Sequence, residues 1–349
     1  MKWHLVPAAR FPEFAARWRE LHARGPASVL LDFDFVAPLV RQFAPPGALL
    51  ACCERQAGTV AMVLLAPASR TSWATLQPSQ APLGLWLAAP GEALEPLLAS
   101  LLRALPGLPL VLGLTQADPM LVARPAETAC LRTLDYIDTA RVTLAGGFEA
   151  YWQDRGKNLR VNLRKQRARL EREGVTPRLE IVRAPQAMAA AVAQYGELES
   201  SGWKSGQGTA VHAENAQGRY YRAMFEALAA RGAASVYRYW FGARLVAMDL
   251  CVEDRDSIVV LKTAYDESIG AGLSPTLLMR EEACRRLFDE GRFERLEFYG
   301  RVMEWHLRWT GEVRTMYHIN YYRWPAVRRL HAMRESIHAS RRAARAAAK

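Results

Sequence analysis

The stretch SIVVLKTAYDESIGAGLSPTLLMREEACRRLFD, residues 257–289, predicts a strand, a glycine turn and a helix in direct succession. Its first part, residues 257–264, is rich in the β-branched side chains that strands favour. Ser274 suits the cap position of the helix, and Pro275 suits its first turn. Because the amides at the start of a helix attract phosphate groups, the turn suggests a pyrophosphate site. The same pattern is also typical of a simple chain reversal.

The surrounding sequence predicts a mixed sheet with helices. Strands are expected at residues 234–240 and 245–253, and the short turns between them make neighbouring strands antiparallel. Another strand is expected after the helix, at residues 294–299, and one long helix is expected before the group, at residues 148–173. The first half of the chain repeats the mixture of strands and helices.

The length of 349 residues exceeds what a single hydrophobic core usually supports, so two domains are expected. The predicted fold class is α/β (α+β), with tandem domains that each hold a mixed, mostly antiparallel sheet flanked by helices. The expected domains are residues 1–147 and 148–325, and the second begins with a basic helix at residues 157–172. A basic tail helix is expected at residues 326–349.

The net charge of +11 is concentrated in two segments. Residues 157–172 hold seven basic residues and one acidic residue, and residues 323–349 hold eight basic residues and one acidic residue. Two solvated helix faces would explain this pattern, and so would an anionic partner at the basic helices.

Several classes of protein are disfavoured by the composition. No apolar run approaches the roughly 20 residues that span a bilayer, and the first residues do not resemble a signal peptide, so a cytoplasmic protein is expected. The five cysteines form no CxxC pair, and the seven histidines show no spacing typical of metal ligands. We therefore expect no metal cofactor.

The order of strands, glycine turn, helix and strand resembles the core of the Gcn5-related N-acetyltransferase (GNAT) superfamily. Within it, the sequence resembles the CelD/BcsL-type acetyltransferases associated with cellulose and exopolysaccharide biosynthesis. The resemblance covers roughly residues 150–325. It rests on the motifs Asn158-Leu159-Arg160, Gly202-Trp203-Lys204, Leu261 to Glu267, Leu273-Ser274-Pro275, Leu277-Leu278, Phe298-Tyr299-Gly300 and Leu307-Arg308-Trp309.

This resemblance implies tandem GNAT-like domains, distantly similar to the FemAB peptidyltransferases, with a degenerate first domain. It also implies that acetyl-CoA or another acyl-CoA binds beside the glycine turn. The donor-binding residues it indicates are Gly270, Gly272, Leu273, Ser274 and Thr276. Two positions depart from the family pattern. Glu267 stands where the signature usually has glutamine or arginine, and His306 stands where lysine is expected.

Direct transfer from a thioester needs a base for the amine and an acid for the departing thiolate. Tyr265 and Tyr299 are the candidate acids, because both follow strands that should meet at the cleft. His306 or Glu304 is the candidate base, and histidine has a suitable unperturbed pKa. Asp249, on an otherwise apolar strand, needs a partner or a cavity and is a second candidate base. Each of these residues also has a structural interpretation.

The acceptor is expected to contact Trp203 and Lys204, in a Gly/Ser-rich loop, and Trp305. Lys262 is a lone cation on an apolar strand and is expected to pair with Asp249 or to bind substrate. The basic helix would direct Arg160, Arg164 and Arg167 toward an anionic acceptor or toward the other domain.

Three functions follow from these residues. The leading hypothesis is an acyl-CoA-dependent N-acyltransferase that acts on a small molecule or on a sugar or polysaccharide precursor. The second is a FemAB-like transferase that uses aminoacyl-tRNA and acts on a cell-wall precursor. The third is a non-catalytic protein whose basic tail binds nucleic acid or a membrane surface.

Overall fold

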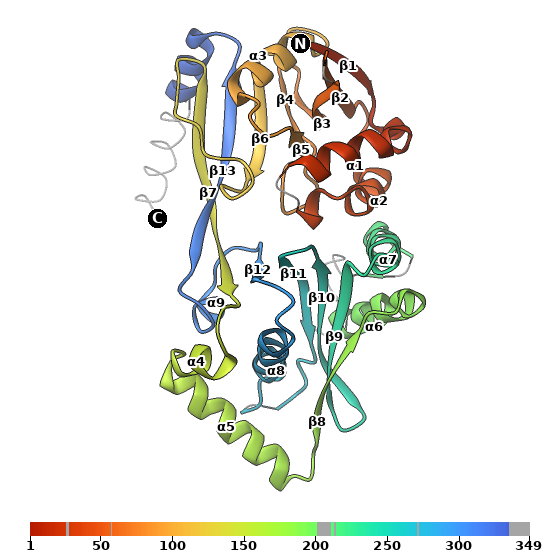
Figure 1. Ribbon diagram of the computed structural model, residues 1–349, viewed down its shortest axis with the longest axis vertical. Helices are drawn as coiled ribbons and strands as arrows, with labels where there is room; N and C mark the ends of the chain where they lie inside the picture. Colours follow the sequence, from red (N-terminus) through yellow and green to blue (C-terminus); the bar gives the residue numbers. More distant parts are fainter. Residues whose placement is uncertain (26–27, 57, 201–210, 213, 271, 335–349) are drawn as a thin grey trace, which may run out of the picture. The chain divides into compact units, whose positions relative to one another are not determined.

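The chain folds into two compact units, shown in the computed structural model of Figure 1. The structure describes residues 1–25, 28–56, 58–200, 211–212, 214–270 and 272–334. Unit 1 contains Met1–Phe33, Ala44–Tyr136 and the chain from Thr315 onward, and unit 2 contains Asp34–Phe43 and Ile137–Arg314. The predicted domains, 1–147 and 148–325, therefore differ from the units at their borders.

Unit 1 is built on a mostly antiparallel sheet. Its strands are β1 (Lys2–Pro7), β2 (Leu49–Arg55), β3 (Gly58–Ser69), β4 (Ser72–Thr75), β5 (Trp86–Ala88), β6 (Val111–Ala117), most of β13 (Val313–Tyr322) and the first part of β7 (Leu131–Thr143). Strands β1, β2, β3, β4, β6 and β13 are neighbours in that order, and β5 pairs with β3. β4 and β6 pair in parallel, whereas β1 with β2, β2 with β3, β3 with β4 and β5, and β6 with β13 pair antiparallel. Four leucines of α3 (Leu94–Ala104) pack into the core of this sheet.

The remaining helices of unit 1 are short. They are the 3-10 helices η1 (Ala8–Phe14) and η2 (Val29–Leu31) and the α-helix α1 (Ala15–Arg24). Residues 325–334 are also helical, as expected for the start of the tail helix, and residues 335–349 lie outside the described residues.

Unit 2 holds the rest of β7 and five further strands. They are β8 (Pro177–Val182), β9 (Ala234–Phe241), β10 (Arg244–Glu253), β11 (Ser257–Tyr265) and β12 (Arg295–Phe298). The order is β7, β12, β11, β10, β9, β8, and only β11 and β12 are parallel. The predicted fold class, mixed and mostly antiparallel sheets flanked by helices, is confirmed.

Helices cover both faces of the sheet in unit 2. On one face, α4 (Phe148–Gln153), α5 (Lys157–Arg172) and α8 (Pro275–Glu290) share one hydrophobic core with the strands. On the other face lie α6 (Met188–Ser200) and α7 (Ala216–Ala229), after the 3-10 helix η3 (Pro185–Ala187). The aromatic side chains of Phe35 and Phe43, from α2 (Phe33–Phe43), pack on Tyr220 of α7.

The single long helix predicted at residues 148–173 is wrong, because α4 and α5 are separate. Gly156, the N-cap residue of α5, has φ −53° and ψ 134°, and this non-helical ψ interrupts the helical path. The basic helix predicted at residues 157–172 coincides with α5. None of the described helices is both long and apolar enough to span a bilayer.

Candidate active site

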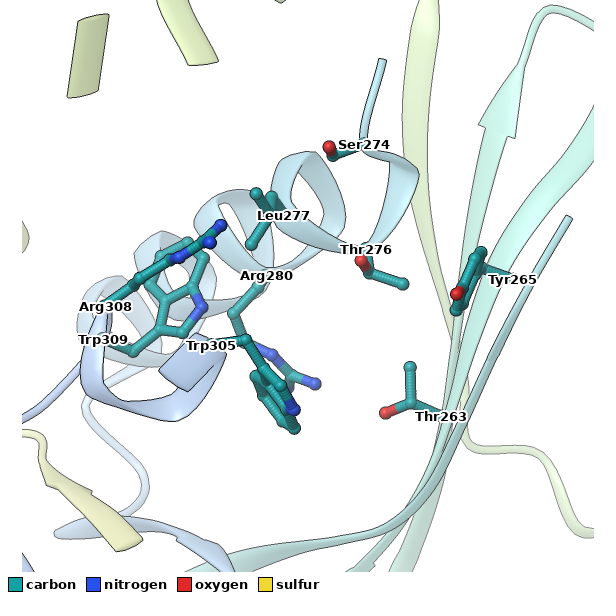
Figure 2. Close-up of a pocket in the computed structure, with 9 residues that line it drawn as sticks. All are labelled: Thr263, Tyr265, Ser274, Thr276, Leu277, Arg280, Trp305, Arg308 and Trp309. Atoms are coloured by element: carbon teal, nitrogen blue, oxygen red, sulfur yellow. The ribbon is translucent and has the colours of Figure 1, made fainter. Parts of the chain in front are cut away.

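A cavity of about 460 Å³ opens in unit 2 between β11, the start of α8 and the segment around α9 (Glu304–Leu307). Figure 2 shows the side chains around it, with β11 on one side and the tryptophans on the other. The lining residues are Thr263, Tyr265, Ser274, Thr276, Leu277, Arg280, Trp305, Arg308 and Trp309. The volume lies within the range typical of small-molecule sites.

The cavity lies where two parallel strands part. β11 and β12 pair from Ser257 with Arg295 as far as Val260 with Phe298. β12 ends there, whereas β11 continues to Tyr265. Thr263 and Tyr265, two residues apart on the continuing part, lie on the same face of the strand and line the cavity. The divergence thus exposes one strand edge to a ligand.

The start of α8 forms another wall of the cavity. Pro275 occupies the first turn as predicted, and Ser274 holds the cap position, although its side chain makes no capping hydrogen bond. Instead the Ser274 amide donates to Oε1 of Gln166 on α5, at 2.7 Å. Gly272 has φ +96°, which side chains rarely allow, and a Cβ there would lie 3.0 Å from Arg169 Nη1. The basic helix α5 therefore lies directly beside the glycine turn.

Arg280, which lines the cavity, belongs to a buried ion pair. Arg280 Nη2 lies 2.7 Å from Asp249 Oδ2, and the two side chains are 5% and 1% exposed. The Thr263 hydroxyl donates to Asp249 Oδ1 at 2.5 Å. Burial raises the pKa of Asp249, while the Arg280 charge and the Thr263 hydrogen bond oppose that rise. Asp249 thus has the partner that its sequence context demanded, and it is separated from the ligand space by Arg280 and Thr263.

The family model of the acetyltransferase (GNAT) domain matches residues 157–307, from the first residue of α5 to the last residue of α9. These residues form a GNAT domain. The protein is therefore an enzyme of the acyltransferase class. None of the curated proteins matches the sequence.

Solved structures share the fold over nearly the whole chain. One is the C-terminal domain of a putative lysylphosphatidylglycerol synthetase from Agrobacterium fabrum, with 15% identity, a TM-score of 0.56 and coverage of 93% of this chain and 96% of the other. Another is FemX, with 9% identity, a TM-score of 0.56 and coverage of 92% and 97%. A conserved protein of unknown function from Bacteroides thetaiotaomicron has 10% identity, a TM-score of 0.55 and coverage of 92% and 99%. At these identities the likeness concerns the fold alone.

The structure brings four of the predicted site residues of the GNAT domain to one cavity. Tyr265, Ser274, Thr276 and Trp305 all line it. Gly270 and Gly272 are exposed in the adjoining turn, and Leu273 packs against the core of unit 2. Trp203 and Lys204 lie outside the described residues.

The predicted pair of Lys262 with Asp249 is wrong. Asp249 is opposite Thr263 in the antiparallel register of β10 and β11, so Lys262 lies on the other face of the strand. There Lys262 Nζ lies 3.1 Å from Glu199 Oε1, 5.7 Å from the ring centre of Tyr195 and 5.5 Å from that of Tyr221. Lys262 therefore does not line the cavity, and it links β11 to α6 and α7.

Three other residues named in the sequence predictions lie apart from the cavity lining. Glu304 is exposed at the start of α9, beside Trp305. Tyr299 is half-buried, and the Arg314 guanidinium lies 5.2 Å from its ring centre. Arg167 on α5 pairs with Glu281 and Glu282 of α8, at 2.8 Å each, so it stabilises helix packing instead of facing an acceptor.

His306 is buried in contacts that suit a structural role. Its ring stacks on Trp305, with the ring centres 3.5 Å apart. Its Nδ1 accepts a hydrogen bond from the Met303 amide at 2.9 Å, which places the proton of the neutral ring on Nε2. Burial lowers the pKa of His306 to about 4. Neutral His306 is a weak base at neutral pH, and its accepting nitrogen is already used.

This pKa makes stability depend on pH. The unfolded chain, with a histidine pKa near 6.5, takes up a proton before the folded chain does as the pH falls. The free energy of unfolding should therefore fall as the pH is lowered from 6.5 to 4, and His306 should account for up to about 3 kcal/mol of that fall. The His306→Asn variant keeps an acceptor for the Met303 amide. We expect its free energy of unfolding, measured by urea titration, to fall less across this pH range than that of the unaltered protein. An equal loss in both proteins would contradict the assignment.

Sequence reasoning missed part of the lining, chiefly Thr263, Leu277, Arg280, Arg308 and Trp309. Helical and strand periodicity could have found two of them. Arg280 follows Thr276 by four residues, which places both on one face of α8, and Thr263 precedes Tyr265 by two on β11. Arg280 was also a lone cation after the apolar run Leu277-Leu278-Met279.

Proposed function

We propose that the GNAT domain transfers an acyl group from acetyl-CoA or another acyl-CoA to the amine of a small molecule or of a sugar or polysaccharide precursor. The observation that supports this most is the cavity at the parting of β11 and β12, which joins a strand edge to the start of α8. A long ligand with an extended arm and a phosphate end matches both walls.

The donor would bind with its phosphates at the start of α8. Ser274 and Thr276 present hydroxyls there, and the helix amides favour negative charge. Arg169 of α5, which also pairs with Glu173 at 2.7 Å, lies close to Gly272 beside the turn. The thioester arm would then run along β11 toward Tyr265 and Thr263.

Acyl transfer at this place follows from general chemistry. The acceptor amine attacks the thioester carbonyl, so a C–N bond forms while the C–S bond breaks and the thiolate leaves. A backbone amide of β11 beyond Val260 would polarise the carbonyl oxygen. The Tyr265 hydroxyl would give the thiolate its proton. Exposed Glu304, next to Trp305, is the better placed base for the amine proton, because His306 is buried and neutral.

The acceptor would lie at the tryptophan end of the cavity. Trp305 is 37% exposed and offers a flat apolar surface, and Arg308 is exposed beside it. This arrangement suits a sugar or another polar ring that carries an amine. The resemblance to the CelD/BcsL-type enzymes favours the same class. Trp203 and Lys204 remain predicted acceptor contacts, whereas Lys262 lies on the opposite face of β11 and does not reach this cavity.

The test is release of the free thiol from acetyl-CoA by the purified protein in the presence of a panel of amines and amino sugars. We expect a thiol signal that depends on one class of acceptor and saturates with it. Absence of release with every acceptor, for both short and long acyl-CoA donors, would refute the proposal.

A second candidate is aminoacyl transfer from charged tRNA, the reaction class that the distant FemAB-like resemblance implies, and the fold shared with FemX is consistent with it. Arg164 and Lys165, exposed on α5, favour a larger phosphate-rich donor. Charged tRNA that competes with acetyl-CoA for the protein would support this candidate. Binding of nucleic acid or membranes by the basic tail stays a prediction, since most of the tail lies outside the described residues.

A further inference from the structure

We propose that unit 1 holds a second ligand site, which takes an aliphatic chain joined to a neutral amide or ester. The site is a cavity of about 310 Å³ beside β5 and α3. Its lining residues are Gly25, Leu31, Trp86, Leu87, Ala88, Ala89, Pro90, Gly91, Glu92, Leu94, Leu97, Leu121, Val122 and Ala123. This inference concerns unit 1 alone and does not depend on the function proposed for unit 2.

The position of this cavity repeats that of the unit 2 cavity. In unit 1, β4 and β5 both pair antiparallel with β3, β4 at residues 65–69 of β3 and β5 at residues 61–63. In unit 2, the single strand β11 pairs antiparallel with β10, so β4 and β5 together correspond to β11. β6 is parallel to β4, just as β12 is parallel to β11. Each cavity is thus bounded by a strand end, the helix that follows, and the segment after the parallel strand.

The turn and the helix correspond as well. Gly91, at φ +81°, precedes α3, and Gly272, at φ +96°, precedes α8. Leu94 and Leu97 of α3 line the unit 1 cavity, and Thr276, Leu277 and Arg280 of α8 line the unit 2 cavity, so the first two turns of the helix contribute to both cavities. The two sites share a framework, and they differ in the side chains placed on it.

Those side chains select a different chemistry. The helix wall of this cavity is formed by leucines, whereas the helix wall of the unit 2 cavity includes Arg280, and among the described residues no lysine or arginine lines the unit 1 cavity. Glu92 lies at its edge, 2.9 Å from Arg55, and Glu95 occupies the first turn of α3. Because Arg55 offsets the charge of Glu92, Glu95 is the side chain that opposes a phosphate or carboxylate at this helix start. With no basic side chain in the described lining, a nucleotide carrier is disfavoured.

The strand edge of β5 supplies the polar part of the site. The Leu64 amide donates to the Leu85 carbonyl at 3.0 Å, and the Ala89 amide donates to the Val60 carbonyl at 2.8 Å. Residues 85, 87 and 89 therefore direct their backbone groups to β3, and Ala88 directs its amide and carbonyl away from β3. Because Trp86–Ala89 line the cavity, these groups suit the amide or ester of a bound chain.

The test is calorimetric titration of the full-length protein with octanamide, a neutral eight-carbon amide. We expect saturable binding of one molecule, weakened at least tenfold by Leu121→Trp, because the indole fills the cavity. Leu108→Trp, at an exposed loop position, is the matched control and should change the affinity less than twofold. If thermal melting shows that the Leu121→Trp protein does not fold, Val122→Trp is used in its place.

Two results would overturn the proposal. One is the absence of octanamide binding, or binding that Leu121→Trp and Val122→Trp leave unchanged, which would place the amide elsewhere on the protein. The other is equal affinity for octanoate, because the acidic helix start should weaken binding of the carboxylate at least tenfold.

Discussion

Replacing Tyr265 by phenylalanine is expected to lower kcat for acyl transfer by about a hundredfold, with little change in donor affinity. Removal of a positioned general acid typically costs 10²–10⁴-fold, and a thiolate leaves readily enough that the lower end applies. Tyr265 lines the cavity at the end of β11 and is 45% exposed, so the change should not disturb the fold. The measurement is steady-state thiol release at saturating donor.

The matched control is Tyr299→Phe. Tyr299 also follows a strand, but it stands beside Arg314 and does not line the cavity. Its loss should change kcat less than twofold. An equal loss of kcat in both variants, or none in Tyr265→Phe, would show that Tyr265 does not act as the acid.

Replacing Arg280 by methionine is expected to destabilise the protein by about 3–5 kcal/mol. The change leaves the Asp249 carboxylate buried, with the Thr263 hydroxyl as its remaining partner among the contacts described above. An unpaired buried charge is costly, and its protonation would recover part of the loss. Urea denaturation at pH 7 gives the free energy of unfolding, and the deficit should shrink as the pH is lowered.

The double variant Arg280→Met with Asp249→Leu distinguishes the effect of an unpaired buried charge from the effect of altered side-chain packing. With both charges removed, the loss should be clearly smaller than in Arg280→Met alone, because replacing a buried pair by apolar residues is often nearly neutral. A loss below 1 kcal/mol in Arg280→Met, or a double variant no better than the single one, would contradict the role assigned to this pair.

Local patterns predicted much of the fold. The strands and the glycine turn around residues 257–289 follow from apolar runs and from punctuation by glycine and proline, and the basic helix was found with its full bounds. The borders of the units were harder to predict from the sequence. Asp34–Phe43 joins unit 2 and the chain from Thr315 joins unit 1, and both depend on contacts between segments far apart in sequence.

Residues of the candidate site were predictable where they stand next to the glycine turn before α8, and less predictable elsewhere. Tyr265, Ser274 and Thr276 were found because they flank the glycines. The partner of Lys262 was misjudged because the faces of β10 and β11 depend on a register that includes a shift between Leu250 and Cys251. The burial of His306 arises from tertiary packing on Phe298, which no local pattern reveals.

The central claim, that the unit 2 cavity binds an acyl-CoA donor, is tested most directly by calorimetric titration with acetyl-CoA. The intact protein should bind one molecule, and Thr276→Glu should weaken binding at least tenfold. A carboxylate at the start of α8 favours the helix and repels the donor phosphates, so folding should be retained. No binding by the intact protein, or equal binding by the Thr276→Glu variant, would contradict the claim.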